Sequence, residues 1–338
     1  MNGRFCSCAI ALLSLASTPA LAQGDGDGLE WTLGGFMRAE TGFGDRYGNA
    51  TDEDTTGISR AALAISSKYE NITGFFAIGG ELMSSTDANE NGNIDIKDAF
   101  VTINELGNGF SVTLGAQPLL FGLKPNGYPA DRSLIGSLEY GAGGAFAVSN
   151  QAGPAIVGAW QANDGNRIRF GIFDQRDYQN SGTLPPAAAS SGSGMSGNYF
   201  LQWNSRDLFD SGIYFAAGVE SRYVGGTVDD DQSIWFVGAG WANEMFDVSL
   251  EHTSLDAAFN GTADDEAYLV TELTWHVPDS PWSVYLDYAD ADELDLQTLR
   301  LGSMRRLNDH FDFAAEYAQD DIGASDVDSI VLRLQLTY

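Results

Sequence analysis

The residues best suited to binding a ligand lie in a stretch rich in aspartate and asparagine, from 87 to 98. Its spacing matches the calcium loop, in which side-chain oxygens occupy positions 1, 3, 5 and 12 and glycine position 6, while position 7 supplies a backbone carbonyl. The ligands in this order of position would be Asp87, Asn89, Asn91, Asn93 (carbonyl) and Asp98. The sequence thus predicts a calcium site, with aspartate in place of the usual closing glutamate and no flanking helices. The alternative is a solvated loop between two strands.

Other carboxylate clusters recur along the chain. Divalent cations held weakly there would bridge the clusters to one another or to lipopolysaccharide. Simple solvation is the favoured explanation, because isolated acidic runs belong to exposed loops. The clusters lie at 52–54, 229–231, 264–266, 290–295 and 320–321.

Hydrolytic chemistry would need a nucleophile beside a base, for example serine beside histidine. The chain has three histidines, His252, His276 and His310, and the sequence indicates a serine partner for none of them. We therefore expect no enzymatic activity of a phospholipase or protease.

The first 22 residues have the pattern of a secretory signal peptide. Arg4 supplies the positive start, 10–15 an apolar core too short to span a bilayer, and 20–22 a small-residue cleavage site. Both cysteines lie inside this segment, so the expected mature chain, 23–338, contains none. We expect that mature chain to form one domain.

The acidity of the chain limits its partners. The formal charge is −30, and without Arg4 there remain 16 basic and 47 acidic residues, a charge of −31. Nucleic acids bind basic surfaces, so we expect no nucleic-acid partner. A chain this acidic suits cations or neutral solutes.

Alternating segments of about 10 residues position these side chains, and such segments are typical of a transmembrane β-barrel. The clearest is the last, where Ile330, Leu332, Leu334, Leu336 and Tyr338 alternate with polar or smaller residues. A barrel in lipid turns such an apolar face outward and keeps the polar face in the lumen. Carboxylates on that second face are tolerated only where it is wet.

Sixteen such segments predict an all-β, 16-stranded antiparallel transmembrane barrel. Their connections alternate between short and long, as expected for short periplasmic turns and long extracellular loops. Both termini then lie at the periplasmic end. The register between 294 and 307 stays open, because leucines of both parities occur there, and 141–149 is interpreted as loop. The segments begin near residues 29, 57, 71, 94, 109, 153, 166, 197, 210, 232, 246, 266, 282, 295, 310 and 328.

The tryptophans provide an independent check on this topology. Only Trp235 falls at the long-loop ends of the predicted strands, whereas six others fall at the short-turn ends. Interfacial aromatic girdles account for such gathering. The six are Trp31, Trp160, Trp203, Trp241, Trp275 and Trp282.

The stretches 97–101 (KDAFV), 112–117 (VTLGAQ) and 121–123 (FGL) resemble the block that precedes the constriction loop of Gram-negative outer-membrane porins, closest to the phosphate-selective type. The C-terminal Tyr338 resembles the signal that the barrel-assembly machinery reads. The resemblance implies that the third long loop, 118–152, folds into the barrel and narrows it, and that the protein is a homotrimer in outer-membrane lipid and lipopolysaccharide. The scarcity of lysine argues against phosphate selectivity, because only Lys68, Lys97 and Lys124 occur.

Charged residues on the predicted loop and on the lumen-facing parity of the strands are the candidate pore residues. An acidic loop opposite a basic wall would create a transverse field that orients polar solutes. Alternatively, the arginines pair with nearby carboxylates and fix the loop. The loop residues are Lys124, Asp131, Arg132 and Glu139, and the strand residues are Arg38, Arg60, Arg167, Arg169, Arg222 and Arg333.

The sequence therefore predicts an outer-membrane porin for passive diffusion of small hydrophilic solutes or ions, cation-preferring or weakly selective. Two alternatives stay open: a substrate-specific channel of the anion or phosphate type, and a barrel with an adhesive or structural role at the cell surface.

Overall fold

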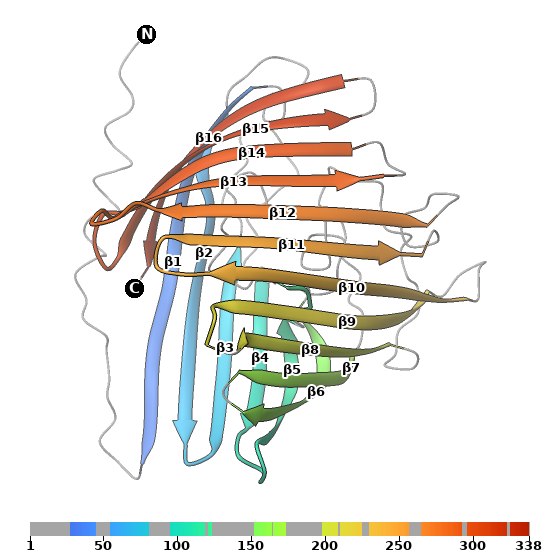
Figure 1. The fold of residues 1–338 in the computed structure, drawn as a ribbon. Helices are drawn as coiled ribbons and strands as arrows, with labels where there is room; N and C mark the ends of the chain where they lie inside the picture. The colour runs from blue at the N-terminus through green and yellow to red at the C-terminus, as the bar shows by residue number, and fades with distance from the viewer. Residues whose placement is uncertain are drawn as a thin grey trace.

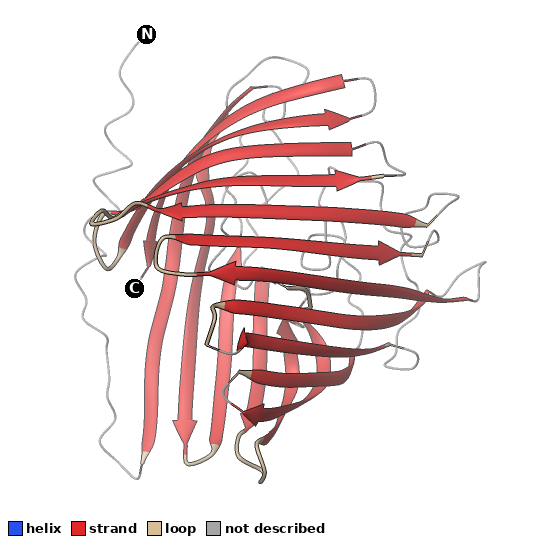
Figure 2. Ribbon diagram, viewed as in Figure 1, coloured by secondary structure: helices blue, strands red, loops and turns tan. Residues whose placement is uncertain are grey.

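The computed structural model describes most of the predicted mature chain as a closed antiparallel β-barrel (Figure 1). Each strand pairs with its neighbours in chain order, and β1 closes the barrel against β16. Strand is the only regular structure in this part of the chain (Figure 2), and no helix in it is long and apolar enough to span a bilayer. The described residues are 28–44, 55–80, 95–118, 121–123, 152–163, 165–173, 198–208, 210–224, 230–256, 265–292, 296–322 and 325–337.

The strand count confirms the sequence prediction, and every predicted start lies within three residues of the observed one. The predicted signal peptide, the segment 141–149 and Tyr338 lie outside the described residues. The strands are β1 Leu29–Gly44, β2 Thr55–Tyr69, β3 Ile72–Gly80, β4 Asp95–Ile103, β5 Phe110–Pro118, β6 Ala152–Asn163, β7 Asn166–Phe173, β8 Tyr199–Leu208, β9 Ile213–Val224, β10 Asp230–Ala242, β11 Phe246–Leu255, β12 Glu266–His276, β13 Trp282–Ala291, β14 Leu296–Arg306, β15 Phe311–Ile322 and β16 Ser325–Thr337.

Tight connections join β2 to β3, β4 to β5 and so on to β14 and β15, and we call the rim they form the short-turn end. Figure 1 shows the β8–β9 and β10–β11 turns side by side at this rim. Three of these turns are built alike, because an asparagine side chain accepts hydrogen bonds from two backbone amides that follow it. The Oδ1 atom of Asn243 accepts from Met245 N at 2.8 Å and Phe246 N at 2.7 Å. Asn163 and Asn308 make the equivalent pairs.

The strands bury one face and expose the other, as the alternation predicts. In β16, Ile330 and Leu334 are 47% and 44% exposed, whereas Val331 and Arg333 are 0% and 6% exposed. In β14, Leu299 and Leu301 face outward, and Thr298 and Arg300 face inward. The structure thus resolves the register that the sequence leaves open. The outward apolar surface is the one that a barrel offers to lipid.

The tryptophans gather as predicted. Trp160 and Trp241 lie at the short-turn end, where their indole N–H groups donate to the backbone oxygens of Asn108 and Ser211, both at 3.1 Å. Trp235 lies towards the other end of β10, with its ring centroid 5.1 Å from that of His252. An aromatic ring with a wet polar edge suits a membrane interface.

In the interior, two tyrosines each cross a glycine of the neighbouring strand and donate a hydrogen bond to a carboxylate of the next strand. The Tyr285 ring of β13 crosses over Gly302 of β14, and its hydroxyl donates to Glu316 Oε2 of β15 at 2.6 Å. In the same way Tyr214 of β9 crosses Gly240 of β10 and donates to Asp247 Oδ1 of β11 at 2.7 Å. Glycine is required in the middle strand, because a Cβ there would overlap the tyrosine ring.

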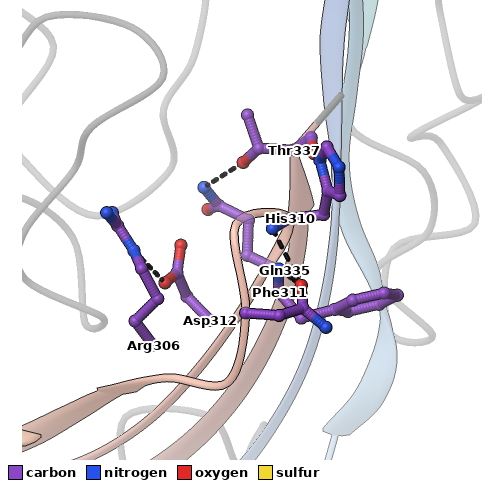
Figure 3. A network of polar contacts seen from close by, with 7 residues as sticks. Arg306, His310, Phe311, Asp312, Gln335 and Thr337 are labelled. Carbon is purple, nitrogen blue, oxygen red and sulfur yellow. Dashed lines mark hydrogen bonds and ion pairs between the residues drawn. The ribbon is translucent and has the colours of Figure 1, made fainter. Parts of the chain in front are cut away.

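Polar side chains join the two strands that close the barrel. Arg38 of β1 donates through Nε and Nη2 to Gln335 Oε1 of β16, at 3.2 and 3.1 Å. Figure 3 shows Gln335 reaching in turn toward the Thr337 hydroxyl, at 3.4 Å, and Arg306 facing Asp312, at 3.3 Å. The first and last strands of the sequence are thus joined by side chains as well as by the backbone ladder.

Candidate functional site

A short segment of the third long connection lies inside the barrel. Residues 121–123, which we call the docked segment, follow β5 by only a few residues, yet their contacts are with β8, β9, β10 and β11. Those strands lie several positions further around the wall. Residues 121–123 of the third long connection therefore lie in the lumen, and the rest of the expected constriction loop, 124–151, lies outside the described residues.

Two hydrogen bonds fix the backbone of the docked segment. The Gln202 side-chain amide of β8 donates to the Gly122 carbonyl oxygen at 3.1 Å. The Leu123 amide donates to Glu251 Oε2 of β11 at 2.6 Å. The second bond has a carboxylate acceptor, and such charge-assisted bonds are about twice as strong as neutral ones.

Apolar packing fixes the side chains of the same segment. Phe121 is fully buried, with its ring 4.8 Å from that of Phe236 in an edge-to-face arrangement. A Cβ on Gly218 would lie 2.8 Å from the Phe121 ring, and a Cβ on Gly238 would lie 2.9 Å from the Leu123 side chain. The two glycines leave the space into which the segment fits.

The docked segment covers one part of a larger apolar surface on the inner wall. Phe121 belongs to a buried cluster to which β6 to β13 each contribute at least one residue, and Leu123 packs against it. An apolar lining of this extent excludes water, so this part of the interior is a packed core rather than open channel. The strand members are Ala155, Val157, Phe173, Phe200, Ala216, Ile234, Phe236, Leu255, Tyr268, Val270, Ala289 and Ala291.

A polar wall runs across β13 to β15, away from the docked segment. Asp287 of β13 pairs in register with Arg300 of β14, and both are almost completely buried. Glu316 accepts the hydroxyl of Tyr285, and Asp320 Oδ1 accepts the Thr298 hydroxyl at 2.7 Å. Acidic and basic groups thus alternate from strand to strand, the arrangement in which buried charges are tolerated.

Sequence reasoning missed Arg300 of this wall. It omitted this fully buried arginine because the register of its segment was left open. Arg300 shares its parity with Thr298 and differs from Leu299 and Leu301. The alternation over 298–301, considered without Leu294 and Leu296, is the signal that could have identified Arg300.

Five of the six predicted strand arginines fall into two groups, and the sixth, Arg222, lies on β9. Arg38 of β1 and Arg333 of β16 face inward and are largely buried, and Arg60 of β2 pairs in register with Arg38. Arg167 and Arg169 of β7 lie on a separate part of the wall, where Arg169 is largely buried and Arg167 is exposed.

Other predicted pore residues are described only in part or not at all. The side chains of Arg60 and Arg222 are outside the described residues, although their strands are within them. The loop residues Lys124, Asp131, Arg132 and Glu139 lie wholly outside. The transverse field therefore stays a prediction.

The calcium prediction rests mainly on residues that are not described, namely Asp87, Asn89, Asn91 and Asn93. The remaining ligand, Asp98, is the fourth residue of β4 and is 6% exposed. Position 12 of the loop thus belongs to the barrel wall. The described residues contain no cluster of three or more metal-ligating side chains.

One expectation about the histidines is wrong. His276 Nδ1 lies 3.0 Å from Ser283 Oγ, because the β12–β13 register places the two residues opposite each other. Ser283 is the one hydrogen-bond partner of the His276 ring among the described residues, so no described carboxylate orients the ring as a catalytic triad requires. His252 lies on the outward parity of β11 against Trp235, and His310 Nδ1 lies 3.0 Å from the Thr337 carbonyl.

No protein-family model matches the sequence, and no curated protein matches it either. Many solved structures share the fold. OmpF of Salmonella typhi in complex with daunomycin has a TM-score of 0.67 at 11% identity, over 92% of this chain and 98% of that one. An anion-selective porin from Comamonas acidovorans has a TM-score of 0.63 at 13% identity, over 92% and 100%. The in-vitro folded, trimeric form of OmpT, an outer membrane protein of Vibrio cholerae, has 0.60 at 13%, over 92% and 100%. The chain therefore has the fold of Gram-negative outer-membrane porins.

Proposed function

We propose that the protein is an outer-membrane porin through which small hydrophilic solutes and ions diffuse passively. The observation that carries this proposal is the docked segment, which occupies part of the lumen of a closed 16-strand barrel. About 16 strands enclose more space than wall side chains fill, so a barrel of this size holds an aqueous channel. A segment held against one side of the wall narrows such a channel but does not close it.

The polarity of the remaining wall supports a water-filled path. Carboxylates also project inward from strands that the docked segment does not contact, such as Glu272 of β12, whose Oε2 accepts the Ser249 hydroxyl at 3.0 Å. Ionised groups of this kind are stable next to water or to polar partners. A barrel packed solid would favour apolar residues at these positions.

We propose a cation preference or weak selectivity, because the predicted mature chain has a formal charge of −31. The second candidate is a substrate-specific channel of the anion or phosphate type. The inward arginines favour it, as does the likeness in fold to a porin described as anion-selective.

The test is the current carried by purified protein in a planar bilayer. We expect stepwise conductance increases and, in a salt gradient, a reversal potential of the sign that cation preference gives. The opposite sign would overturn the cation preference and leave the porin proposal standing. A folded protein that adds no conductance would overturn the porin itself and favour the adhesive or structural role.

Three further proposals accompany the porin. The protein is a homotrimer, which the trimeric form of the similar Vibrio cholerae OmpT supports. Its C-terminal Tyr338 is read by the barrel-assembly machinery. Calcium binds the loop closed by Asp98. Size measurement in detergent, with the detergent mass subtracted, tests the first, and deletion of Tyr338 tests the second by loss of the folded barrel from the membrane.

A further inference from the structure

Three arginines meet on the inner wall at the ends of β7 and β8. Arg167 and Arg169 are two residues apart on β7, so they share the inward face on which Phe173 is buried. Arg206 lies near the end of β8, where its backbone amide donates to Gly165 at 2.6 Å, just before β7 begins. We call Arg167, Arg169 and Arg206 the arginine trio.

The members of the trio repel one another. Arg167 lies close enough to Arg169, and Arg206 to Arg167, for their like charges to repel. Among the described residues, no carboxylate lies within ion-pair distance of Arg167 or Arg206. Placing like charges together costs free energy unless an opposite charge joins them.

The groups across the ladder from the trio are neutral. Arg169 pairs in register with Gln202 and Ala159, and Arg167 pairs with Asn204 and Gln161. Amide side chains offer hydrogen bonds but no compensating charge. The direct ladder partners of Arg167 are thus both amides, and those of Arg169 are an amide and an alanine.

Gln202, the ladder partner of Arg169, links the docked segment to the wall beside the trio. This side chain donates to the Gly122 carbonyl at 3.1 Å and to Asn204 Oδ1 at 2.8 Å, so it joins the docked segment to the neighbours of the trio. Arg169 is held with its guanidinium carbon 5.7 Å from the Phe200 ring centroid. Arg167 and Arg206 are exposed, towards the short-turn end.

We propose that the arginine trio is a binding subsite for an oxyanion, carried by a carboxylate or phosphate group on a permeating solute. Exposed guanidinium groups bind such groups through paired, charge-assisted hydrogen bonds. The bound anion would relieve the repulsion within the trio. The subsite lies on the short-turn side of the docked segment, so an anionic solute that passes the segment meets it before leaving the barrel. This inference rests on the porin function, and it adds a retention point for anions to a channel whose net charge favours cations.

The first test uses single channels in potassium chloride, with inorganic phosphate or acetate added at the short-turn side. We expect brief current reductions whose frequency rises with phosphate and, more weakly, with acetate, because phosphate carries the larger charge. The double variant Arg167→Gln, Arg206→Gln should lower that frequency about tenfold, as expected when two charge-assisted contacts are lost. Equal frequencies in the two proteins would overturn the subsite.

The matched control is Arg306→Gln. Arg306 is also exposed at the short-turn end, but it is already paired with Asp312 at 3.3 Å. We expect this variant to keep the wild-type event frequency. A reduction equal to that of the double variant would mean that any charge at this rim suffices, and it would overturn the proposal.

A second measurement does not depend on conductance. The ³¹P resonance of inorganic phosphate should broaden with detergent-solubilised wild-type protein and with Arg306→Gln, but not with the double variant, in a detergent that contains no phosphorus. Equal broadening by all three proteins would reject the subsite. A wild-type barrel that broadens the signal but passes no current would reject the porin function alone, so the two failures are distinguishable.

Discussion

Replacing Phe121 by alanine should release the docked segment from the inner wall. The Phe121 side chain is fully buried and packs edge-to-face on Phe236. Removing a buried phenylalanine side chain costs about 3–5 kcal/mol. The backbone anchors from Gln202 and Glu251 remain in the variant, so the prediction depends on what those two bonds alone can hold.

The remaining anchors nearly balance the cost of ordering the segment. A neutral hydrogen bond contributes about 1 kcal/mol and one to a charged group about 1.5–3 kcal/mol. Fixing the backbone of three residues costs about 3–6 kcal/mol in conformational entropy. Without the aromatic anchor the docked and released states therefore become comparable in free energy, whereas in the wild type the docked state dominates.

Single-channel recording tests this prediction. A segment that leaves the wall part of the time should increase current noise and change the mean conductance of the Phe121→Ala channel. The control is Phe110→Ala, which removes the same side chain from the outer surface, where it stacks on Trp160 at 6.0 Å. We expect that control to conduct as the wild type does.

Intact barrels must be compared. Folded outer-membrane barrels migrate differently in gels before and after heating, and both variants should keep that difference. A Phe121→Ala protein that is folded and has wild-type conductance and noise would refute the view that Phe121 anchors the segment in the lumen.

Three other perturbations test separate parts of the structure. Gly302→Ala should lower the free energy of unfolding by about 1–3 kcal/mol, because its Cβ overlaps the Tyr285 ring; urea unfolding in detergent measures this, and the loss should shrink when Tyr285 is also replaced by alanine. Asn308→Ala removes the acceptor of two turn hydrogen bonds and should cost about 1–2 kcal/mol in the same assay, whereas no cost would show that the turn holds its shape without it. Removing calcium with a chelator should increase protease cleavage between 81 and 94, and cleavage that is the same with and without chelator would count against the calcium site.

The strands were predictable because the barrel imposes one simple rule on each of them. Every strand must show an apolar face to lipid, so alternation marks strand positions wherever that face is continuous. The last strand shows this clearly, with Ile330 and Leu334 outside and Val331 and Arg333 inside. Asparagine and glycine mark the turns for an independent reason, since turn geometry requires them.

The register of β14 was not predictable, because the signal there is mixed. Leucines of both parities occur from 294 to 307, so no single face is marked as apolar. Pairing with neighbours decides the register: Leu301 lies opposite Leu286 of β13 and Tyr317 of β15, and all three are exposed. That information is spread over three strands, whereas within the segment only the short run 298–301 alternates. The contact between His276 and Ser283 was missed for the same reason, since it depends on the β12–β13 register.

The location of the docked segment lies still further from what a sequence pattern can show. The resemblance implied that the third long loop turns inward, but it did not indicate where on the wall the loop would dock. The deciding contact joins Leu123 to Glu251, 128 residues apart, and Gly218 and Gly238 provide the space. In the sequence of a single strand, a lumen-facing glycine does not indicate that another segment docks there, because glycine fits both the apolar and the polar positions of the alternation.

A side chain that points into the barrel is not necessarily a pore-lining side chain, because the docked segment covers some of the inner wall. Alternation tells which side chains point inward, but the docked segment decides which of them are dry. Phe236 and Glu251 both face inward, on adjacent strands, yet one packs against the Phe121 ring and the other binds the Leu123 amide. The segment gives the Glu251 carboxylate a donor and the Phe236 ring an apolar neighbour, so both side chains favour the docked state. Wall and segment therefore specify each other, and under the proposed porin function solutes would pass along the parts of the wall that the segment does not cover.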